Sequence, residues 1–226
     1  MNKLDPRNIY DDLHQIPELG FEEFKTSAYL ADKLEAMGYK VTRNIGGTGV
    51  IGEIKGSEPG PVMMLRADMD ALPFLIDGEK KNIHACGHDA HSAMLLAAAS
   101  ELVGKVKRGT LRILFQQGEE TLKGALAVID AGVIEDVDIA LGLHIRPVQD
   151  IAYGEMSPAV RHASSTFVNV VINGLSSHGA RPHLGVNAIE AAAVAINAIT
   201  AIKINPIIPW SCKVTGIKGG GVAPNI

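Results

Sequence analysis

The feature that most constrains this chain is a dense run of potential metal ligands between residues 84 and 91. The run reads His84-Ala85-Cys86-Gly87-His88-Asp89-Ala90-His91, and an apolar helical pattern follows it. Cys86 and His88 are two residues apart, so an extended backbone would direct both side chains to one side. A thiolate and an imidazole at this spacing suit a divalent ion, zinc first, with manganese, cobalt or nickel as further candidates. The alternative is a buried thiol beside surface histidines.

The composition bounds the class of protein. With 226 residues, of which 46% are hydrophobic, and a formal net charge of -4, the chain can bury a core as one large domain or as one domain and part of a second. No basic block indicates nucleic-acid binding, and no signal-like N-terminus or apolar run indicates membrane insertion. The chain has only 2 cysteines, so a disulfide framework is not expected and a cytoplasmic protein with reduced thiols is.

Helical and strand patterns alternate along the first part of the chain, which is typical of an α/β fold. We expect a mixed, partly parallel sheet flanked by helices. The predicted helices cover residues 4–13, 26–37, 92–103 and 124–131, and the predicted strands cover 39–43, 49–54, 62–66, 111–115 and 139–143. The helix that begins at residue 92 is apolar nearly all round, so we expect it to be deeply buried.

The pattern changes near residue 160. Residues 165–172 alternate like a strand with one exposed face, 187–202 form an alanine- and isoleucine-rich helix, and 213–217 read as a further strand. We therefore predict two domains, 1–163 and a smaller α+β domain at 164–226. The sequence stops directly after strand and turn signals, so we expect it to be the N-terminal part of a longer protein.

Polar residues follow three of the predicted strands, and a fourth polar group directly precedes a predicted helix. Asp68 and Asp70 follow one predicted strand, the pair Glu119-Glu120 follows a second, and His144 follows a third. The Cys86/His88 cluster directly precedes a buried helix. Ligands bind beyond the carboxyl ends of the strands in open α/β sheets, so these groups are expected to converge on one site.

Each of these groups also has a simpler interpretation. Adjacent carboxylates are commonly part of a solvated loop, but beside a metal one could bind the ion while the other accepts a proton from water. His144 could be a core histidine with its polar atoms satisfied. Asp68 and Asp70 could orient a ligand imidazole, or could form an acidic loop held by Arg66.

The order of the motifs resembles the aminoacylase/carboxypeptidase family of metallo-amidohydrolases. The similar branch holds hippurate hydrolase, indole-acetyl-amino-acid hydrolases and N-acyl-amino-acid amidohydrolases. The matching segments are HQIPELGFEEFKT, RADMDALPF, HACGHDAHSAMLL, QQGEE, GLHIRP, SSHGARPH and GGGVAPNI. One departure is Gln117-Gly118 before the acid pair, where family members usually have Pro-Ala.

This resemblance implies a zinc-exopeptidase-like fold with two divalent metal ions, zinc or manganese, and with cobalt or nickel possible. It implies that the metal ligands are Cys86, His88, Glu120 and His144, and that a further histidine ligand comes from a segment absent here. Glu119 is implied as the general base, with Asp70 orienting a ligand. The smaller domain is implied to form a homodimer, in which His178 stabilises the oxyanion in the partner's site and Asn225 holds the substrate carboxylate.

The activity that the resemblance implies is metal-dependent hydrolysis of the amide bond of N-acyl amino acids. Because one ligand is expected from outside this chain, we expect weaker activity for the 226 residues alone. One alternative is a non-catalytic or impaired metal-binding fragment. Another is a related N-acetyl-diaminopimelate deacetylase or dipeptidase, since the specificity depends on pocket shape.

Overall fold

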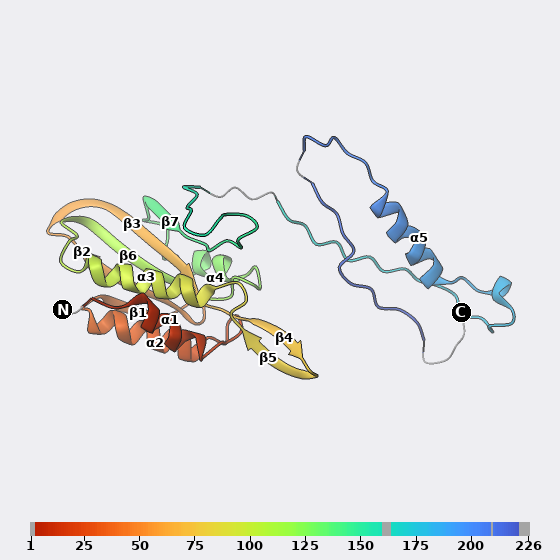
Figure 1. Ribbon diagram of the computed structural model, residues 1–226, viewed down its shortest axis with the longest axis horizontal. Coiled ribbons are helices and arrows are strands. Elements are labelled where there is room, and N and C mark those ends of the chain that lie inside the picture. The colour runs from red at the N-terminus through yellow and green to blue at the C-terminus, as the bar shows by residue number, and fades with distance from the viewer. Residues whose placement is uncertain (1–2, 160–163, 209, 222–226) are drawn as a thin grey trace. The chain divides into compact units, whose positions relative to one another are not determined.

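The protein is described by a computed structural model that covers residues 3–159, 164–208 and 210–221 (Figure 1). The chain falls into two compact units, residues 1–155 and 156–226, which are described separately. The predicted domain boundary between residues 163 and 164 borders a segment outside the described residues, and it stays a prediction.

A mixed five-stranded sheet forms the centre of the first unit, in the order β1-β2-β6-β3-β7. Three neighbouring strands, β6, β3 and β7, run parallel, whereas β2 is antiparallel to β6 and β1 to β2. This confirms the predicted mixed, partly parallel sheet. The strands are β1 (Lys40–Ile45), β2 (Gly49–Lys55), β3 (Glu58–Asp68), β6 (Arg108–Gln116) and β7 (Ile139–Gly142).

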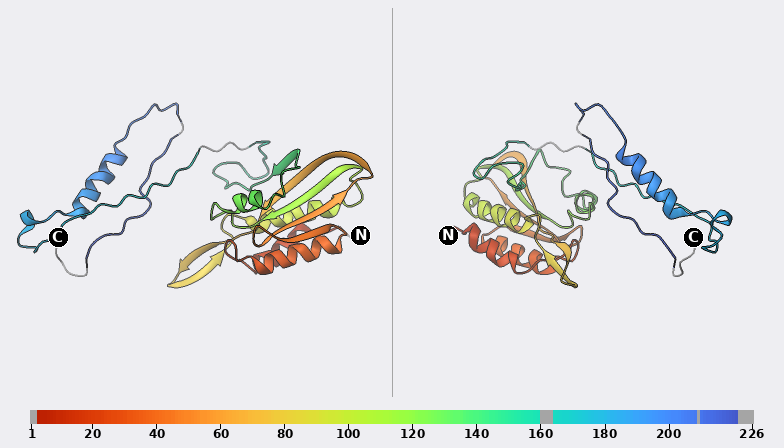
Figure 2. Two further views of the ribbon diagram at one scale, coloured as in Figure 1. Left: turned by 180° about the vertical axis from the view of Figure 1, so that it is seen from behind. Right: turned by 45° about the vertical axis from the view of Figure 1, so that its right-hand side comes forward.

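Helices cover both faces of this sheet. Successive side chains of a strand point to opposite faces, so Ile113 and Phe115 of β6 pack with α1, α2 and α3, while Leu114 packs with Val128 of α4. Each fully buried side chain of this size contributes roughly 1.5–3 kcal/mol to folding. On the first face, α3 packs against both α1 and α2 (Figure 2). The helices are α1 (Pro6–His14), α2 (Phe24–Ala36), α3 (His88–Leu102) and α4 (Gly124–Asp130).

Helix α3 is the central helix of the first unit, as the all-round apolar pattern predicts. Leu96 and Ala99 are fully buried, and they pack in the same core as Leu13 of α1 and Leu34 of α2. The buried residues of its first turn are polar, namely His88, Asp89 and His91. The apolar side chains of α3 therefore pack into the core, whereas the polar side chains of its N-terminal turn lie outside this apolar cluster.

The first helix shows why the predicted element ends are close to the observed ones. Asp5 caps α1 by accepting a hydrogen bond from the Arg7 amide at 2.9 Å, and Pro6 takes the first helical position, where its missing N–H is harmless. Ile9 and Leu13 then face the core one turn apart. The helical pattern that starts at residue 4 therefore becomes a helix two residues later, at the proline.

The structure contains a two-stranded hairpin that the sequence interpretation did not predict. β4 (Leu72–Ile76) and β5 (Glu79–Ile83) pair antiparallel around Asp77 and Gly78. Both turn residues have positive φ, 53° and 82°, as the commonest two-residue hairpin turn requires. The Asp-Gly pair was the available signal. The flanking residues are largely exposed and show no alternation, so the strand pattern is weak there.

The second unit contains one long helix, α5 (Ala188–Thr200), which confirms the helix predicted there. Asn187 caps it, because its side chain accepts hydrogen bonds from the amides of Ile189 and Glu190. A short 3-10 turn, η1 (Pro182–Leu184), precedes it. Over the residues that the structure describes, no helix combines the length and the apolar character needed to cross a membrane.

The two strands predicted for the second unit are wrong. Residues 165–172 and 213–217 are not assigned to any strand, and the described part of the unit has a single isolated bridge, between Leu175 and Val186. A strand is held by hydrogen bonds to a neighbouring strand, and neither segment has one among the described residues. The alternating apolar side chains consequently remain exposed, Phe167 at 75% and Val171 at 81%.

Candidate metal centre

The carboxyl ends of the parallel strands meet at one edge of the sheet. In the pairing of β3 with β6, Asp68 lies opposite Gln116, and in the pairing of β3 with β7, Arg66 lies opposite Gly142. The residues that follow each strand therefore emerge together. This is the convergence that the positions of Asp70, Glu119, Glu120 and His144 predict.

A tight turn delivers the fourth segment to this edge. The Gly87 amide donates to the His84 carbonyl, and Gly87 has a φ of +83° before α3 starts at His88. This positive φ favours glycine, and a β-carbon on Gly87 would also lie 2.1 Å from Cδ1 of Ile145, so that side chain would have to move. Cys86 and His88 therefore do not lie on one extended segment. The left-handed turn, rather than strand alternation, brings both side chains to the site.

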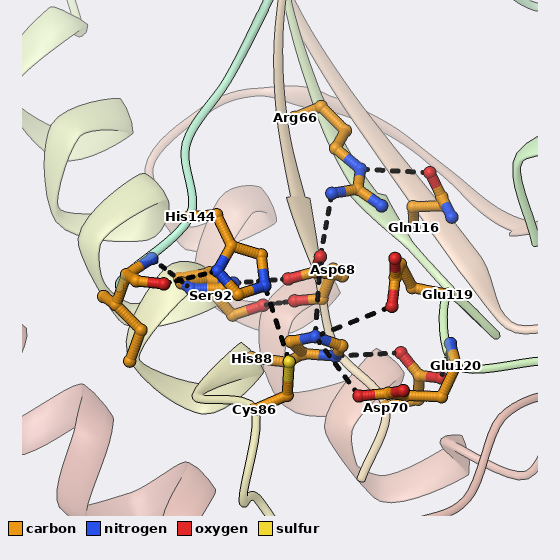
Figure 3. Close-up of polar contacts among 12 residues, drawn as sticks. Arg66, Asp68, Asp70, Cys86, His88, Ser92, Gln116, Glu119, Glu120 and His144 are labelled. Carbon is orange, nitrogen blue, oxygen red and sulfur yellow. Dashed lines mark hydrogen bonds and ion pairs between the residues drawn. The ribbon is translucent and has the colours of Figure 1, made fainter. Parts of the chain in front are cut away.

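His88 lies at the centre of the site and is completely buried. Its Nδ1 is 3.1 Å from Oδ1 of Asp70, while its Nε2 faces three carboxylates, Asp68 at 3.7 Å and Glu119 and Glu120 at 3.8 Å each (Figure 3). Burial alone would lower the pKa of His88, but the hydrogen bond to Asp70 and the surrounding negative charges raise it. Among the described residues, His88 Nε2 has no hydrogen-bond partner.

Two overlapping groups of potential ligands surround His88. One group is Cys86, His88 and Glu120, and the other is Asp68, His88, His91 and His144, with the ligand atoms of each within 4.8 Å of one another. The Cys86 Sγ atom lies 3.5 Å from Nε2 of His144. The structure therefore brings together all four predicted ligands, Cys86, His88, Glu120 and His144. Which of them bind a metal stays a prediction.

The chemistry of this donor set fits a divalent cation. Nε2 of His88 and Oε1 of Glu120 are both buried without a hydrogen-bond partner in the described part of the chain, an arrangement that normally costs folding free energy. Burial and the nearby Glu120 and Glu119 carboxylates raise the pKa of the Cys86 thiol to about 12. A bound cation would satisfy the two orphaned atoms and reverse the electrostatic penalty on a thiolate.

The two carboxylates of the acid pair, Glu119 and Glu120, have different surroundings. The Glu120 amide donates to Oδ2 of Asp70 at 2.9 Å, so Asp70 contacts both His88 and the acid pair. Glu119 is the more exposed of the two, with 36% of its side chain accessible against 23% for Glu120. Burial raises the pKa of Glu119, and the charges of Asp68 and Glu120 add to this effect, while His88 opposes it. A carboxylate with a raised pKa at the mouth of the site suits proton transfer.

The structure also reveals a polar layer behind the site, in which the pairing of Asp68 with Arg66 follows one of the two sequence interpretations and His91 is a member that the sequence interpretation did not assign. Asp68 is fully buried, and its Oδ1 lies 2.6 Å from Nδ1 of His91, while its Oδ2 accepts from the Arg66 guanidinium at 2.8 Å. Burial alone would raise the pKa of Asp68, but the His91 hydrogen bond and the Arg66 charge lower it to about 2. The available signal was the spacing, because His88 and His91 are three apart and lie on one helix face.

Two further predicted residues do not belong to the unit that holds this site. His178 belongs to the second unit, where it is exposed and its Nδ1 accepts a hydrogen bond from the Ala180 amide at 3.1 Å. Asn225 lies outside the described residues. The roles assigned to both stay predictions.

Comparison with known proteins identifies the family. Residues 64–216 match the model of Peptidase family M20/M25/M40, and the chain belongs to this family. The chain is 37% identical over 223 residues to thermostable carboxypeptidase 1 of Saccharolobus solfataricus, which covers 92% of this chain and 57% of the relative. It is 36% identical over 218 residues to hippurate hydrolase of Campylobacter jejuni, with the same two coverages of 92% and 57%. The chain thus spans little more than half the length of these relatives.

A solved structure gives the same assignment. The chain resembles the YXEP protein of Bacillus subtilis, described as a dinuclear metal binding peptidase from the M20 family, with a TM-score of 0.57 and 37% identity. The similarity covers 63% of this chain and 42% of that protein. The predicted membership of a metallo-amidohydrolase family and the predicted α/β fold are therefore confirmed.

Proposed function

We propose that this chain supplies most of a two-metal centre that hydrolyses the amide bond of N-acyl amino acids. The observation that carries the proposal is His88 Nε2, buried, without a hydrogen-bond partner, and facing the carboxylates of Asp68, Glu119 and Glu120. Cys86 and His144 complete the set of donors around it. Relatives named hippurate hydrolase and N-acetyl-L-cysteine deacetylase support the substrate class.

In this proposal Cys86, His88, Glu120 and His144 hold two divalent ions, zinc or manganese, with cobalt or nickel as alternatives. Bound ions of this kind supply Lewis acidity, which lowers the pKa of a water and polarises an amide carbonyl. Glu119 accepts the proton of the attacking water and then passes it to the leaving amine. Its partial exposure leaves it accessible to substrate, and its raised pKa brings it closer to neutrality.

The second unit has a separate role in this proposal. His178, from the partner in a homodimer, stabilises the developing oxyanion, and Asn225 holds the substrate carboxylate. The family resemblance is the support for both roles, together with the exposure of His178, which leaves its imidazole accessible. Dimer formation and a cytoplasmic location are part of the same proposal.

Two substitutions at the acid pair test the division of roles. Glu119→Gln should leave the bound metal per chain unchanged and abolish hydrolysis of N-benzoylglycine and N-acetyl amino acids. Glu120→Gln should reduce the bound metal itself, because the residue is a proposed ligand. Glu22→Gln is the matched control, since Glu22 is exposed. Metal content is measured by elemental analysis and turnover by release of the free amino acid.

The same measurements can refute the proposal. A chain that binds no metal would support the rival interpretation of a non-catalytic protein. Full turnover by Glu119→Gln would remove Glu119 as the general base. Cleavage of dipeptides in preference to N-acyl amino acids would keep the metal centre and change the substrate class, as the name of the Saccharolobus carboxypeptidase allows.

A further inference from the structure

His91 uses both of its ring nitrogens in hydrogen bonds. It is completely buried on α3, one turn after His88. Its Nε2 accepts the Ile145 backbone N–H at 2.9 Å, and its Nδ1 lies 2.6 Å from Oδ1 of Asp68. A backbone N–H can only donate, so Nε2 must be the unprotonated nitrogen and Nδ1–H must donate to Asp68. These contacts fix the imidazole in a single tautomer.

These hydrogen bonds argue against His91 as a metal ligand, although its ring lies within ligand distance of Asp68, His88 and His144. Binding through Nε2 would displace the Ile145 N–H from its acceptor. Binding through Nδ1 would require loss of the proton and of the 2.6 Å contact with Asp68. Each change breaks a hydrogen bond in a buried region, where an unsatisfied polar group is costly.

Ile145 directly follows His144, and this part of the chain has few other attachments. Strand β7 has only four residues, Ile139–Gly142, and pairs with β3 alone. Its apolar side chains are partly exposed, Ile139 at 44% and Leu141 at 55%. Little packing therefore holds the end of this strand. The hydrogen bond from Ile145 to His91 ties it to α3, beside the imidazole of His144.

The other end of this connection, Asp68, is held by further hydrogen bonds. Asp68 is fully buried, its second carboxylate oxygen accepts from Arg66 at 2.8 Å, and its carbonyl accepts from the Ser92 hydroxyl at 2.8 Å. Gly87 adds a close contact, since its missing side chain makes room for Ile145. Asp68 thus holds His91, and His91 holds the backbone that carries His144.

We propose that Asp68, His91 and the Ile145 amide form a relay that positions His144 as a metal ligand, and that His91 is a positioning residue. The proposal rests on the metal centre proposed above. A positioning role of His91 differs from a ligand role in one measurable respect. Loss of a ligand removes a binding site, whereas loss of a positioning contact weakens binding and leaves the number of sites unchanged.

Two substitutions at residue 91 separate the two hydrogen bonds. Gln can place its amide oxygen where Nε2 of His91 accepts the Ile145 N–H. Asn instead places its amide nitrogen near Nδ1, where it can donate to Asp68 but cannot reach Ile145. We therefore expect His91→Asn to weaken zinc binding about 10- to 100-fold at unchanged stoichiometry. His91→Gln keeps the hydrogen bond to Ile145 but loses the one to Asp68, so it should bind zinc more tightly than His91→Asn and less tightly than the unaltered chain.

Zinc affinity and stoichiometry are measured by competition with a chromogenic chelator, on the full 226-residue chain with zinc as the only ligand. A lower stoichiometry in both variants would show that His91 is a ligand and would overturn the proposal. Equal affinity in all three proteins would also overturn it. Failure of the unaltered chain to bind zinc would count against the proposed function.

A second measurement uses only the unaltered chain, so it does not depend on whether the variants fold. Nitrogen-15 NMR of the unaltered, metal-free chain reports which imidazole nitrogen carries the proton. The relay predicts the Nδ1–H tautomer for His91, with no direct zinc-dependent shift of its Nε2 resonance to the position of a metal-bound nitrogen. The opposite tautomer, or such a shift, would refute the relay independently of the proposed hydrolase activity.

Discussion

Glu23 offers the sharpest test of how the acid pair is held in place. Its carboxylate is completely buried at the start of α2. Oε1 accepts the Gly118 amide at 2.8 Å, and Oε2 accepts the Thr48 hydroxyl at 2.5 Å. Gly118 immediately precedes Glu119. A substitution at Glu23 therefore acts on the loop that carries the candidate base and on the stability of the unit.

The size of the effect follows from these two hydrogen bonds. Glu23→Ala leaves two donors, the Gly118 amide and the Thr48 hydroxyl, without an acceptor. Each buried unsatisfied donor costs about 1–3 kcal/mol. Removal of a desolvated carboxylate offsets part of this loss, so we expect a net destabilisation of about 2–4 kcal/mol. Glu23→Gln keeps an acceptor for Gly118 and an amide that can donate to Thr48, so its cost should be about 1 kcal/mol or less.

The pH dependence adds an independent signature. Burial raises the pKa of Glu23 above its ordinary 4.5, despite hydrogen bonds from Thr48 and Gly118 that lower it. The folded state therefore holds this proton more tightly than the unfolded state does. The stabilising contribution of this proton is fully present below pH 4.5 and is lost as the pH rises through the folded-state pKa. Glu23→Gln should remove this loss.

The assay is urea unfolding followed by circular dichroism at about pH 5 and about pH 7.5. The unaltered chain should lose more stability across this range than Glu23→Gln does. Glu22→Ala is the control, because its side chain is exposed and its effect should stay within about 0.5 kcal/mol. If Glu23→Ala unfolds at the same urea concentration as the unaltered chain, the buried carboxylate does not hold the loop and the reasoning fails.

Three further outcomes are expected. Gly87→Ala should destabilise the chain by more than about 2 kcal/mol in urea unfolding. The reason is that Gly87 has a φ of +83° and that a β-carbon would meet Ile145 at 2.1 Å. An unchanged unfolding midpoint would contradict the turn geometry. Tyr39→Phe should cost about 1 kcal/mol, since the buried hydroxyl donates to the Ala99 carbonyl at 2.9 Å. Zinc at about 100 times its dissociation constant should raise stability by about 2.7 kcal/mol, and a chelator should remove this gain in a thermal melt.

The elements that the sequence predicts correctly are those whose periodicity reflects burial. The apolar pattern of α3 and the short apolar run of β6 follow directly from the core that they enter. The β4–β5 hairpin depends on the local turn at Asp77-Gly78 and on little burial, so hydrophobic periodicity could not reveal it. The strand pattern at 165–172 is real, but pairing requires a neighbour that the described residues do not provide.

The same distinction holds at the site. Parallel strands bring their carboxyl ends to one edge, and this rule alone predicts that Glu120 and His144 approach Cys86 and His88. No comparable rule predicts which side chains far apart in the sequence form hydrogen bonds with one another. The Asp68–His91 contact joins residues 23 apart in sequence, and the Glu23–Gly118 contact joins residues 95 apart. These partners become visible only when the chain is folded.

The four acids of the site differ in how completely their charges are satisfied, and this difference divides their roles. Asp68 is paired with Arg66 and His91, and Asp70 accepts from the Glu120 amide and contacts His88. Both oxygens of each of these two carboxylates already have a polar partner, so both carboxylates hold other groups in place. Glu120 retains a buried oxygen without a partner, and Glu119 is partly exposed with a raised pKa. Like charges this close oppose folding unless a cation joins them. The geometry therefore favours the glutamate pair for the metal and the substrate, and it favours a positioning role for Asp70, the orienting residue that the family resemblance implies.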